Sequence, residues 1–215
     1  MDNNEVTIVD YGLSNILSVE QGFKKIGAKT IVTSNLNKIQ NAKKIVLPGV
    51  GAFENAMNSI NNLQLSEVLV NAANEGVPFL GICLGMQLLF DESDEFGLSK
   101  GLGLIPGRVE RYPLSKSKIQ SVKIPQINWH ELVPSRSKID WEDTLLNDLT
   151  IDEAVYFVHS YVASPLIMSH RLADYNYGGN LISAVVLKDN IMGCQFHPEK
   201  SGKTGLKILK NFMKL

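Results

Sequence analysis

The sequence predicts an α/β fold with a doubly wound, mostly parallel central sheet flanked by helices, and with added antiparallel strands in the C-terminal half. Two observations support this prediction. Up to about residue 83, short apolar runs alternate with helix-periodic segments, which is the pattern of βαβ units on a parallel sheet. From about Gly101 onward the apolar runs are shorter and are broken by Gly, Pro, Ser and Asn, a texture typical of hairpins and added strands.

The N-terminal part supplies the predicted parallel strands and the helices between them. After the opening run from Val6 to Asp10, apolar residues recur at helical spacing from Ile16 until Gly27 ends the pattern. Further apolar runs and helical patterns follow in alternation. Strands are predicted at residues 6–10, 30–33, 44–49 and 78–83, and helices at 16–26, 53–60, 65–75 and 86–90.

The C-terminal part supplies the predicted added strands and a closing helix. The strands fall within the runs VERYP (109–113), SVKIPQINW (121–129), AVYFVHSYV (154–162), LISAVVL (181–187) and IMGCQF (191–196). The last segment, 203–214, carries one apolar helical stripe (Leu206, Leu209, Phe212 and Met213), which should pack against the sheet. Since no internal repeat or long linker divides the chain, we expect one domain spanning residues 1–215.

The composition points to a small-molecule or protein partner. The chain has 215 residues, 44% hydrophobic and 20% charged, with a formal net charge of -1, so nothing in its bulk charge favours nucleic acid or an anionic membrane. The polar start lacks the pattern of a secretory signal, and no run approaches the ~20 apolar residues of a membrane span, which leads us to expect a cytoplasmic protein. Neither metal-ligand spacing nor a nucleotide-binding glycine motif occurs, so no metal and no cofactor are expected.

Cys83 is the first candidate catalytic residue. The sequence Gly81-Ile82-Cys83-Leu84-Gly85 follows an apolar strand and precedes a helical pattern, which is the layout of a nucleophile elbow. Small neighbours allow a sharp turn that projects the nucleophile, and the helix N-terminus favours the thiolate form. The alternative is a buried cysteine in a glycine-flanked turn.

His197 and Glu199 offer a base and its orienting carboxylate. Two residues apart in extended chain, their side chains point to the same face, so the carboxylate can hold the imidazole while the other ring nitrogen addresses Cys83. The long sequence separation is no objection, because catalytic triads are assembled in space. Alone, His-Pro-Glu could equally be a surface turn.

Gly49, Val50 and Gly51 form a third candidate feature. They follow the third apolar run and precede a helical pattern, and the glycines leave the backbone free to direct an N–H group into a site. We expect one part of an oxyanion hole here. A tight strand-to-helix turn is the other interpretation.

Taken together, these motifs resemble the class I, or triad-type, glutamine amidotransferases, which have a flavodoxin-like fold. More narrowly, the chain is similar from end to end to the HisH glutaminase subunits of imidazole glycerol phosphate synthase. The segments that carry this resemblance are Asp10-Tyr11-Gly12 with Asn15-Ile16, PGVGAF (48–53), CLGMQLLF (83–90), VHSY (158–161) and QFHPEKS (195–201).

The resemblance implies a role for each matching residue. Cys83 would attack the side-chain amide of L-glutamine to form a thioester, while His197 would protonate the departing ammonia and then activate water. Glu199 would orient His197. Four residues would form the glutamine pocket and two would supply oxyanion N–H groups: Gln87 and Glu95 for the head group, Ser160 and Tyr161 for the lining, and Val50 and Leu84 for the oxyanion hole.

A partner subunit is also implied. In this family it is HisF, a (β/α)8-barrel cyclase that receives ammonia through an internal channel and makes imidazole glycerol phosphate and AICAR in histidine biosynthesis; Lys200 would lie near the interface. Releasing ammonia into a closed channel avoids its loss to water. We therefore expect poor activity of the isolated chain and strong stimulation by a loaded partner, acting through the backbone of residues 48–51.

One departure from the family pattern keeps other acceptors open. Where these subunits typically read Pro-His-Met/Ile-Gly-Trp-Asn, this chain reads Pro125-Gln126-Ile127-Asn128-Trp129-His130. The alternatives are a paralogous glutaminase that feeds another synthase, such as one forming acetamidino groups on surface sugars, and a non-catalytic regulatory relative. A cysteine peptidase on a similar elbow is disfavoured by the small-amide pocket motifs.

The remaining Cys and His residues are expected to lie outside the triad. Only two cysteines occur, and in a reducing compartment we expect two thiols, with Cys194 as a structural one. His159 lacks a carboxylate at the matching offset, which favours a packing role. His130 and His170 stand in polar contexts and are predicted to be solvated.

Overall fold

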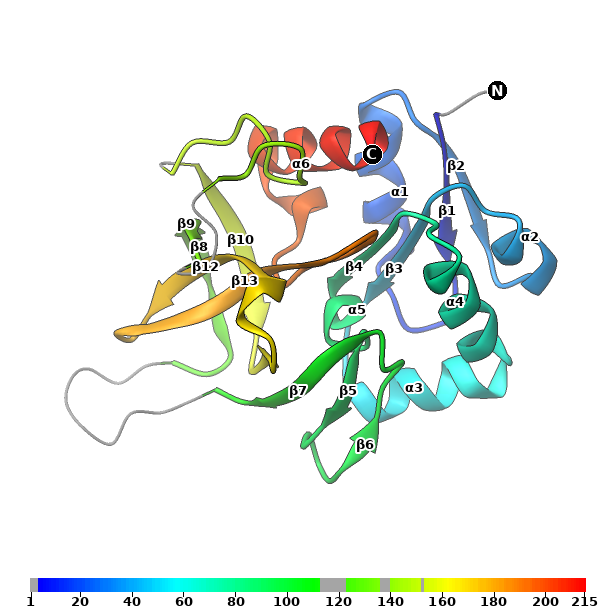
Figure 1. Cartoon of the computed structure of the whole chain (residues 1–215), viewed down its shortest axis with the longest axis horizontal. Coiled ribbons are helices and arrows are strands. Elements are labelled where there is room, and N and C mark those ends of the chain that lie inside the picture. The colour runs from blue at the N-terminus through cyan, green and yellow to red at the C-terminus, as the bar shows by residue number, and fades with distance from the viewer. Residues whose placement is uncertain (1–3, 113–122, 136–139, 152) are drawn as a thin grey trace.

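A computed structural model describes residues 4–112, 123–135, 140–151 and 153–215 of the chain. Its centre is a sheet with strand order β2-β1-β3-β4-β14-β13-β12-β9 (Figure 1). The strands from β2 to β14 pair in parallel, and the others extend the sheet antiparallel. The parallel strands are β1 (Glu5–Val9), β2 (Lys29–Thr33), β3 (Ile45–Gly49), β4 (Phe79–Cys83) and β14 (Ile191–Cys194), and the antiparallel ones are β9 (Val133–Pro134), β12 (Arg171–Tyr177) and β13 (Asn180–Lys188).

Helices cover both faces of the parallel part of the sheet. On one face lie α1 (Ile16–Lys25) and α6 (Gly202–Lys214), and on the other lie α2 (Leu36–Gln40), α3 (Phe53–Asn62) and α4 (Leu65–Asn74) (Figure 1). Strands β3 and β4 are buried along their whole length, as expected for central parallel strands covered on both faces. Alternation along β3 divides the core, because Val46 joins the cluster under α1 and α6 while Leu47 joins the cluster under α3 and α4.

The added strands form two smaller sheets beside the carboxyl ends of the parallel strands. One pairs β8 (Gln126–Glu131) with β10 (Ala154–His159), and the other has the order β11-β7-β5-β6. Only Ser160 separates β10 from β11, so the chain passes from one small sheet to the other at a single residue. The second sheet comprises β5 (Phe90–Ser93), β6 (Ser99–Lys100), β7 (Ile105–Arg111) and β11 (Tyr161–Pro165), and two 3-10 turns, η1 (Met168–His170) and η2 (Pro198–Lys200), complete the described elements.

The predicted fold class is confirmed, with several corrections to individual elements. Strand β12 was not predicted, and the run 154–162 contains two strands, β10 and β11. The helix predicted at 86–90 is a single turn, α5 (Leu84–Gln87), and Phe90 begins β5 instead. The backbone from Leu88 onward pairs with a neighbouring segment and does not continue the helix. The N–H of Leu102 donates to the Leu88 carbonyl, and the N–H of Gly103 donates to the Phe90 carbonyl. An apolar run of this length fits a buried strand as well as a helix. The short helix α2 has only two apolar residues and was not predicted.

The predicted closing helix is also confirmed, with a shifted buried face. Its fully buried side chains include Ile208, Leu209 and Phe212, whereas Leu206 is half-buried. Of the predicted strand runs, Pro113, Ser121 and Val122 lie outside the described residues. Within the described ranges, no helix is long and apolar enough to cross a membrane.

Candidate active site

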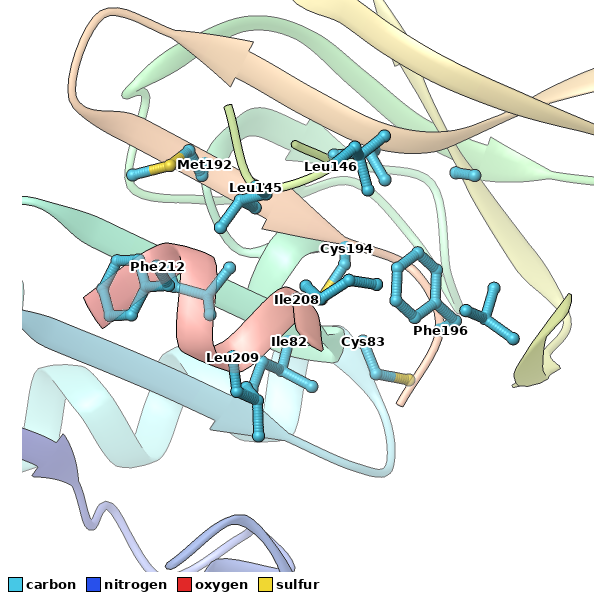
Figure 2. Close-up of a cluster of buried hydrophobic side chains, with 14 of the residues drawn as sticks. Ile82, Cys83, Leu145, Leu146, Met192, Cys194, Phe196, Ile208, Leu209 and Phe212 are labelled. Atoms are coloured by element: carbon cyan, nitrogen blue, oxygen red, sulfur yellow. The ribbon is translucent and has the colours of Figure 1, made fainter. Parts of the chain in front are cut away.

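Cys83 stands on a sharp turn between β4 and α5. Its backbone has φ 56° and ψ -111°, a conformation that residues with side chains rarely adopt. The turn requires its glycines, because a Cβ on Gly85 would lie 1.7 Å from the carbonyl oxygen of Leu47, and one on Gly81 would lie 2.6 Å from that of Gly85. Figure 2 shows the Cys83 sulfur at the margin of a hydrophobic cluster, directed away from Ile82. This is the geometry that the elbow motif predicts.

His197 and Glu199 meet Cys83 from the segment after β14. The Nδ1 atom of His197 lies 2.8 Å from the Glu199 carboxylate, and both side chains are almost completely buried. The backbone fixes this pair, since the N–H of His197 donates to the Tyr156 carbonyl at 3.0 Å and Ser201 Oγ donates to the His197 carbonyl at 2.6 Å. The other ring nitrogen, Nε2, is buried and has no hydrogen-bond partner in the described part of the chain, so it is the atom available to the thiol side of the site.

The electrostatics of this group favour a protonated imidazole. Burial by itself lowers the pKa of His197, but the Cys83 sulfur and the Glu199 carboxylate outweigh burial and raise that pKa to about 10. At neutral pH the ring therefore carries a positive charge next to the sulfur. Such a charge stabilises a thiolate, which is the nucleophilic form of cysteine.

Cys194 has the opposite environment, as its predicted structural role requires. It is completely buried among apolar side chains such as Phe196 and Ile208, as Figure 2 shows. Burial raises the pKa of the Cys194 thiol well above its ordinary value, and the charges of Glu199 and Cys83 act in the same direction. Both cysteines are free thiols in the structure.

A cavity of about 310 Å³ opens in front of Cys83. Its volume suits a small amino acid. Of the residues predicted from the sequence it brings together Cys83, His197, Val50, Gly51, Leu84, Gln87, Glu95, Ser160 and Tyr161, and Pro125, Val158 and His159 complete the lining. Gly49 lies behind the lining, where a Cβ would approach the Tyr11 hydroxyl, and Lys200 is exposed at the surface beyond Glu199.

Gln87 and Glu95 present acceptors to this cavity. The Nε2 atom of Gln87 donates to the Tyr161 carbonyl and to Gln195 Oε1, both at 3.0 Å, so both of its hydrogens are used and the carbonyl oxygen is the group left for a ligand. Glu95 accepts a hydrogen bond of 2.7 Å from the N–H of Phe53 through Oε2, which ties it to the start of α3. Two acceptors, one of them a carboxylate, suit an ammonium group.

The two predicted oxyanion donors, the N–H groups of Leu84 and Val50, differ in whether they are already hydrogen-bonded. Leu84 begins α5, where the first backbone N–H groups of a helix have no intrahelical partner. The N–H of Val50, in contrast, donates to the Leu13 carbonyl at 3.3 Å. Gly51 next to it has φ +97°, so the loop adopts a conformation in which the Val50 donor is engaged away from the sulfur. In this structure only one of the two donors is open to a ligand.

His159 lines the cavity but is unsuited to act as a base. It is buried, and burial lowers its pKa to about 4, so it is neutral near pH 7. Its Nδ1 contacts the Tyr161 carbonyl at 2.9 Å and its Nε2 contacts the Tyr175 hydroxyl at 2.9 Å. The packing role predicted for His159 agrees with this position.

The prediction that His130 is solvated is wrong. Its ring lies 5.2 Å from that of Tyr175 and 5.5 Å from that of Tyr177, and burial lowers its pKa. These partners come from β12, far along the chain, so the polar neighbours of His130 in sequence gave a false signal. His170, also predicted to be solvated, is half-buried in η1, and burial lowers its pKa too.

Sequence reasoning missed two residues beside the site. Gln195 is completely buried, and its Nε2 lies 3.9 Å from the Cys83 sulfur. Its position two residues before His197 was a usable signal, because alternation places both side chains on one face. Tyr11 is buried with its hydroxyl toward Gly49, and burial together with the Cys83 charge raises its pKa. Among the described residues, no group of three or more His, Cys, Asp or Glu side chains could hold a metal ion.

Comparison with known proteins assigns this arrangement to a family. The family model "Glutamine amidotransferase class-I" matches residues 7–215. The chain belongs to the class I glutamine amidotransferases. Two curated relatives carry the more specific name "Imidazole glycerol phosphate synthase subunit HisH": one from Legionella pneumophila (strain Lens), named HisH 1, is 45% identical over 99% of this chain and 100% of its own. The other, from Prochlorococcus marinus (strain MIT 9312), is 42% identical over 98% of each chain.

Solved structures support the amidotransferase fold independently. A structure described as "Crystal structure of glutamine amidotransferase" superposes with a TM-score of 0.70 at 15% identity, covering 97% of this chain and 99% of that one. "Structure of PurLQS from Thermotoga maritima" gives a TM-score of 0.70 at 18% identity, covering 98% and 97%. The resemblance inferred from the sequence is therefore confirmed for the family, and this amidotransferase shares its full length with HisH subunits.

Proposed function

We propose that this amidotransferase is the glutaminase subunit of an imidazole glycerol phosphate synthase, a single domain over residues 1–215 that acts in the cytoplasm. The observation that supports this most directly is the triad geometry, in which a buried His197–Glu199 pair, joined at 2.8 Å, shares the cavity wall with the strained Cys83 elbow. The HisH names of full-length relatives at 42% to 45% identity support the same assignment.

Acylation begins with L-glutamine in the cavity. The Cys83 sulfur attacks the side-chain amide carbon, forming a C–S bond and a tetrahedral oxyanion. The C–N bond then breaks, and His197 transfers its Nε2 proton to the leaving nitrogen, so that ammonia departs and a glutamyl thioester remains. The positive charge on His197 is suited to this step, because the ring holds a proton next to the sulfur at neutral pH.

Deacylation uses the same residues, but His197 now accepts a proton instead of donating one. His197, now neutral, takes a proton from water, and the hydroxide oxygen attacks the thioester carbon. The C–S bond breaks, glutamate leaves and the thiolate–imidazolium pair is restored. Glu199 holds the Nδ1 side of the ring through both steps, which keeps Nε2 directed at the reacting atoms.

The cavity also orients the substrate. The free acceptors of Gln87 and Glu95 bind the α-ammonium group of glutamine, whereas Ser160 and Tyr161 line the wall beside it. A substrate held in this way presents its side-chain amide to the sulfur. An amide without the ammonium group leaves the half-buried Glu95 carboxylate without its cation, so we expect a preference for the free amino acid.

The partner that we propose is a HisF-like barrel cyclase, bound to form a heterodimer. The exposed apolar residues Leu13 and Val50 form a patch next to the cavity, which Val50 lines, and Lys200 is exposed near the triad. The patch includes both ends of the hydrogen bond that holds the Val50 N–H away from the sulfur. A subunit docked on Leu13 and Val50 can exchange that bond and release the second oxyanion donor, which couples hydrolysis to the presence of the acceptor enzyme.

The test is glutamate release from glutamine by the purified chain, alone and with a cognate barrel cyclase plus its phosphoribosyl-aminoimidazole-carboxamide ligand. Freeing one oxyanion donor is worth roughly a hundred- to thousandfold in kcat, so we expect stimulation of that order. Activity that depends on Cys83 but ignores the cyclase would contradict the histidine-pathway role and favour another synthase, in line with the departure at Gln126 to His130. No hydrolysis under either condition would contradict the glutaminase itself.

A further inference from the structure

Gln195 connects the Cys83 sulfur to the substrate pocket. It lies in the extended segment between β14 and His197, is completely buried, and has its backbone N–H bound to the Ala184 carbonyl at 2.8 Å. Its side-chain amide has a partner at each end: Nε2 lies 3.9 Å from the Cys83 sulfur, and Oε1 accepts the 3.0 Å hydrogen bond from Gln87. The triad chemistry described above does not use this residue.

The orientation of the Gln195 amide follows from its neighbours. The carbonyl oxygen of Tyr161 can only accept, so the Gln87 atom 3.0 Å from it must be the nitrogen. That nitrogen also faces Gln195, which must therefore present its oxygen to Gln87. The opposite end of the Gln195 amide, its NH2 group, then faces the sulfur. A backbone carbonyl thus fixes the direction of the whole chain of hydrogen bonds from Tyr161 to Cys83.

We propose that Gln195 is a positioning residue that donates an N–H to the Cys83 thiolate and, through Gln87, keeps an acceptor turned toward the ammonium group of the substrate. This inference rests on the proposed glutaminase function and adds a residue to it. An N–H donor stabilises a thiolate and gives nothing comparable to a thiol. The Val158 carbonyl, 4.0 Å from the sulfur, is an acceptor that favours the thiol, and the Gln195 donor offsets its effect.

Two substitutions separate the two parts of this role. Gln195→Leu removes both the donor to sulfur and the acceptor for Gln87. Gln195→Glu keeps an acceptor for Gln87 but replaces the donor with a negative charge beside the sulfur. A matched control is Gln126→Leu, because Gln126 is another completely buried strand glutamine that contacts Tyr175 at 3.4 Å and does not line the cavity.

The first measurement is the rate of alkylation of Cys83 by iodoacetamide against pH, with the modified peptide identified by mass spectrometry so that Cys194 is excluded. It uses the full chain alone and needs neither glutamine nor a partner. Since one hydrogen bond to a charged group shifts such an equilibrium by about one pH unit, Gln195→Leu should move the midpoint of the alkylation profile upward by about that amount. Gln195→Glu should move it further, and Gln126→Leu should leave it at the wild-type value.

The second measurement is the kinetics of glutamine hydrolysis in the complex with the barrel cyclase. Gln195→Leu should raise KM and lower kcat, since both the pocket acceptor and the nucleophile are affected. Gln195→Glu should lower kcat with a smaller change in KM. Thermal unfolding of each variant shows whether it is folded, and if Gln195→Leu does not fold, Gln195→Glu still tests the donor.

The two proposals fail in different ways. A wild-type alkylation profile in both folded Gln195 variants, or in Gln195→Glu alone if only that variant folds, would overturn the role of Gln195 even if glutamine hydrolysis is observed. A shift in Gln126→Leu as large as in Gln195→Leu would also overturn it, because the effect would then be one of general packing. If wild-type protein hydrolyses no glutamine with its partner, the glutaminase proposal fails, while the alkylation profile still reports on the thiolate.

Discussion

The ends of β4 and β14 lie side by side and each carries a cysteine, yet the two thiols have opposite environments. Cys194 pairs with Ile82 across the two strands, one position before Cys83. At β14 the backbone stays regular and the side chain points into the core. At β4 the chain turns through a positive φ and the sulfur faces His197 and a cavity. The difference shows that the turn at the end of the strand, more than a cysteine's place in the sheet, decides which thiol faces the cavity.

The sharpest test of this comparison removes each thiol group in turn. Cys83→Ala should lower glutamine hydrolysis by at least about a thousandfold, since the variant lacks the proposed nucleophile beside His197. Cys194→Ala should leave hydrolysis near the wild-type rate and cost about 1 kcal/mol of unfolding free energy through the small void it leaves. Glutamate release and thermal unfolding measure the two effects, and comparable loss of activity in both variants would contradict the distinction.

The turn itself can be broken at Gly85. Gly85→Ala should cost more than about 4 kcal/mol or prevent folding, because the new Cβ would meet the Leu47 carbonyl oxygen at 1.7 Å. Gly76→Ala provides the comparison of backbone strain without a clash: Gly76 has a positive φ, +88°, which Gly85 does not, but open space around it, so the substitution should cost only about 1 kcal/mol. Chemical denaturation compares them. Equal costs would contradict the close approach to Leu47 as the reason that Gly85 is necessary.

A smaller effect on activity is expected from removing the charge of Glu199, the carboxylate that pairs with His197 near Cys83. Glu199→Gln removes the charge 2.8 Å from His197 Nδ1 and should lower kcat roughly a hundredfold with little change in KM, since the ring loses its orientation and part of its charge stabilisation. The pH–rate profile of the complex provides the measurement. A changed KM with an unchanged kcat would place Glu199 in substrate binding instead.

The smallest expected effect is on the pH dependence of stability. The folded pKa of His197, about 10, lies above its ordinary value of 6.5, so between these values the folded state holds a proton that the unfolded state releases. The contribution of this group to stability is therefore full below about pH 6.5 and is lost as the pH rises toward 10. Denaturation at several pH values should show a shallower fall for His197→Gln than for wild type. Identical slopes in the two proteins would mean that His197 gains no proton affinity on folding.

Local patterns made much of the fold and the triad predictable. The Gly81-Ile82-Cys83-Leu84-Gly85 elbow and the His197-Pro198-Glu199 pair are each formed by residues adjacent in sequence, so local spacing indicated each motif, and the family resemblance joined them into one triad. The length of α5 was not predictable in this way, because the competing hydrogen bonds come from residues 102 and 103. Periodicity does not distinguish a helix from a strand in so short an apolar run.

Features that depend on residues distant in sequence could not be predicted from the sequence. His130 is surrounded by rings from β12, and the Val50 N–H is held by Leu13, and neither contact has a signature in the neighbouring sequence. Gln195 was visible as part of a motif, but its role depends on the direction of a hydrogen bond that begins at the Tyr161 carbonyl. Sequence indicates which side chains share a face, whereas donor and acceptor directions require the structure.

The two small sheets are connected at the wall of the cavity by a single residue. β10 is bonded to β8 and β11 to β7, and Ser160, which lines the cavity, is the single residue between them. A rotation about Ser160 would change the angle between the two strand pairs without breaking the ladder hydrogen bonds within either pair. β8 carries the exposed side chains of Ile127 and Trp129, so a partner bound there would contact the strand pair that ends at the cavity.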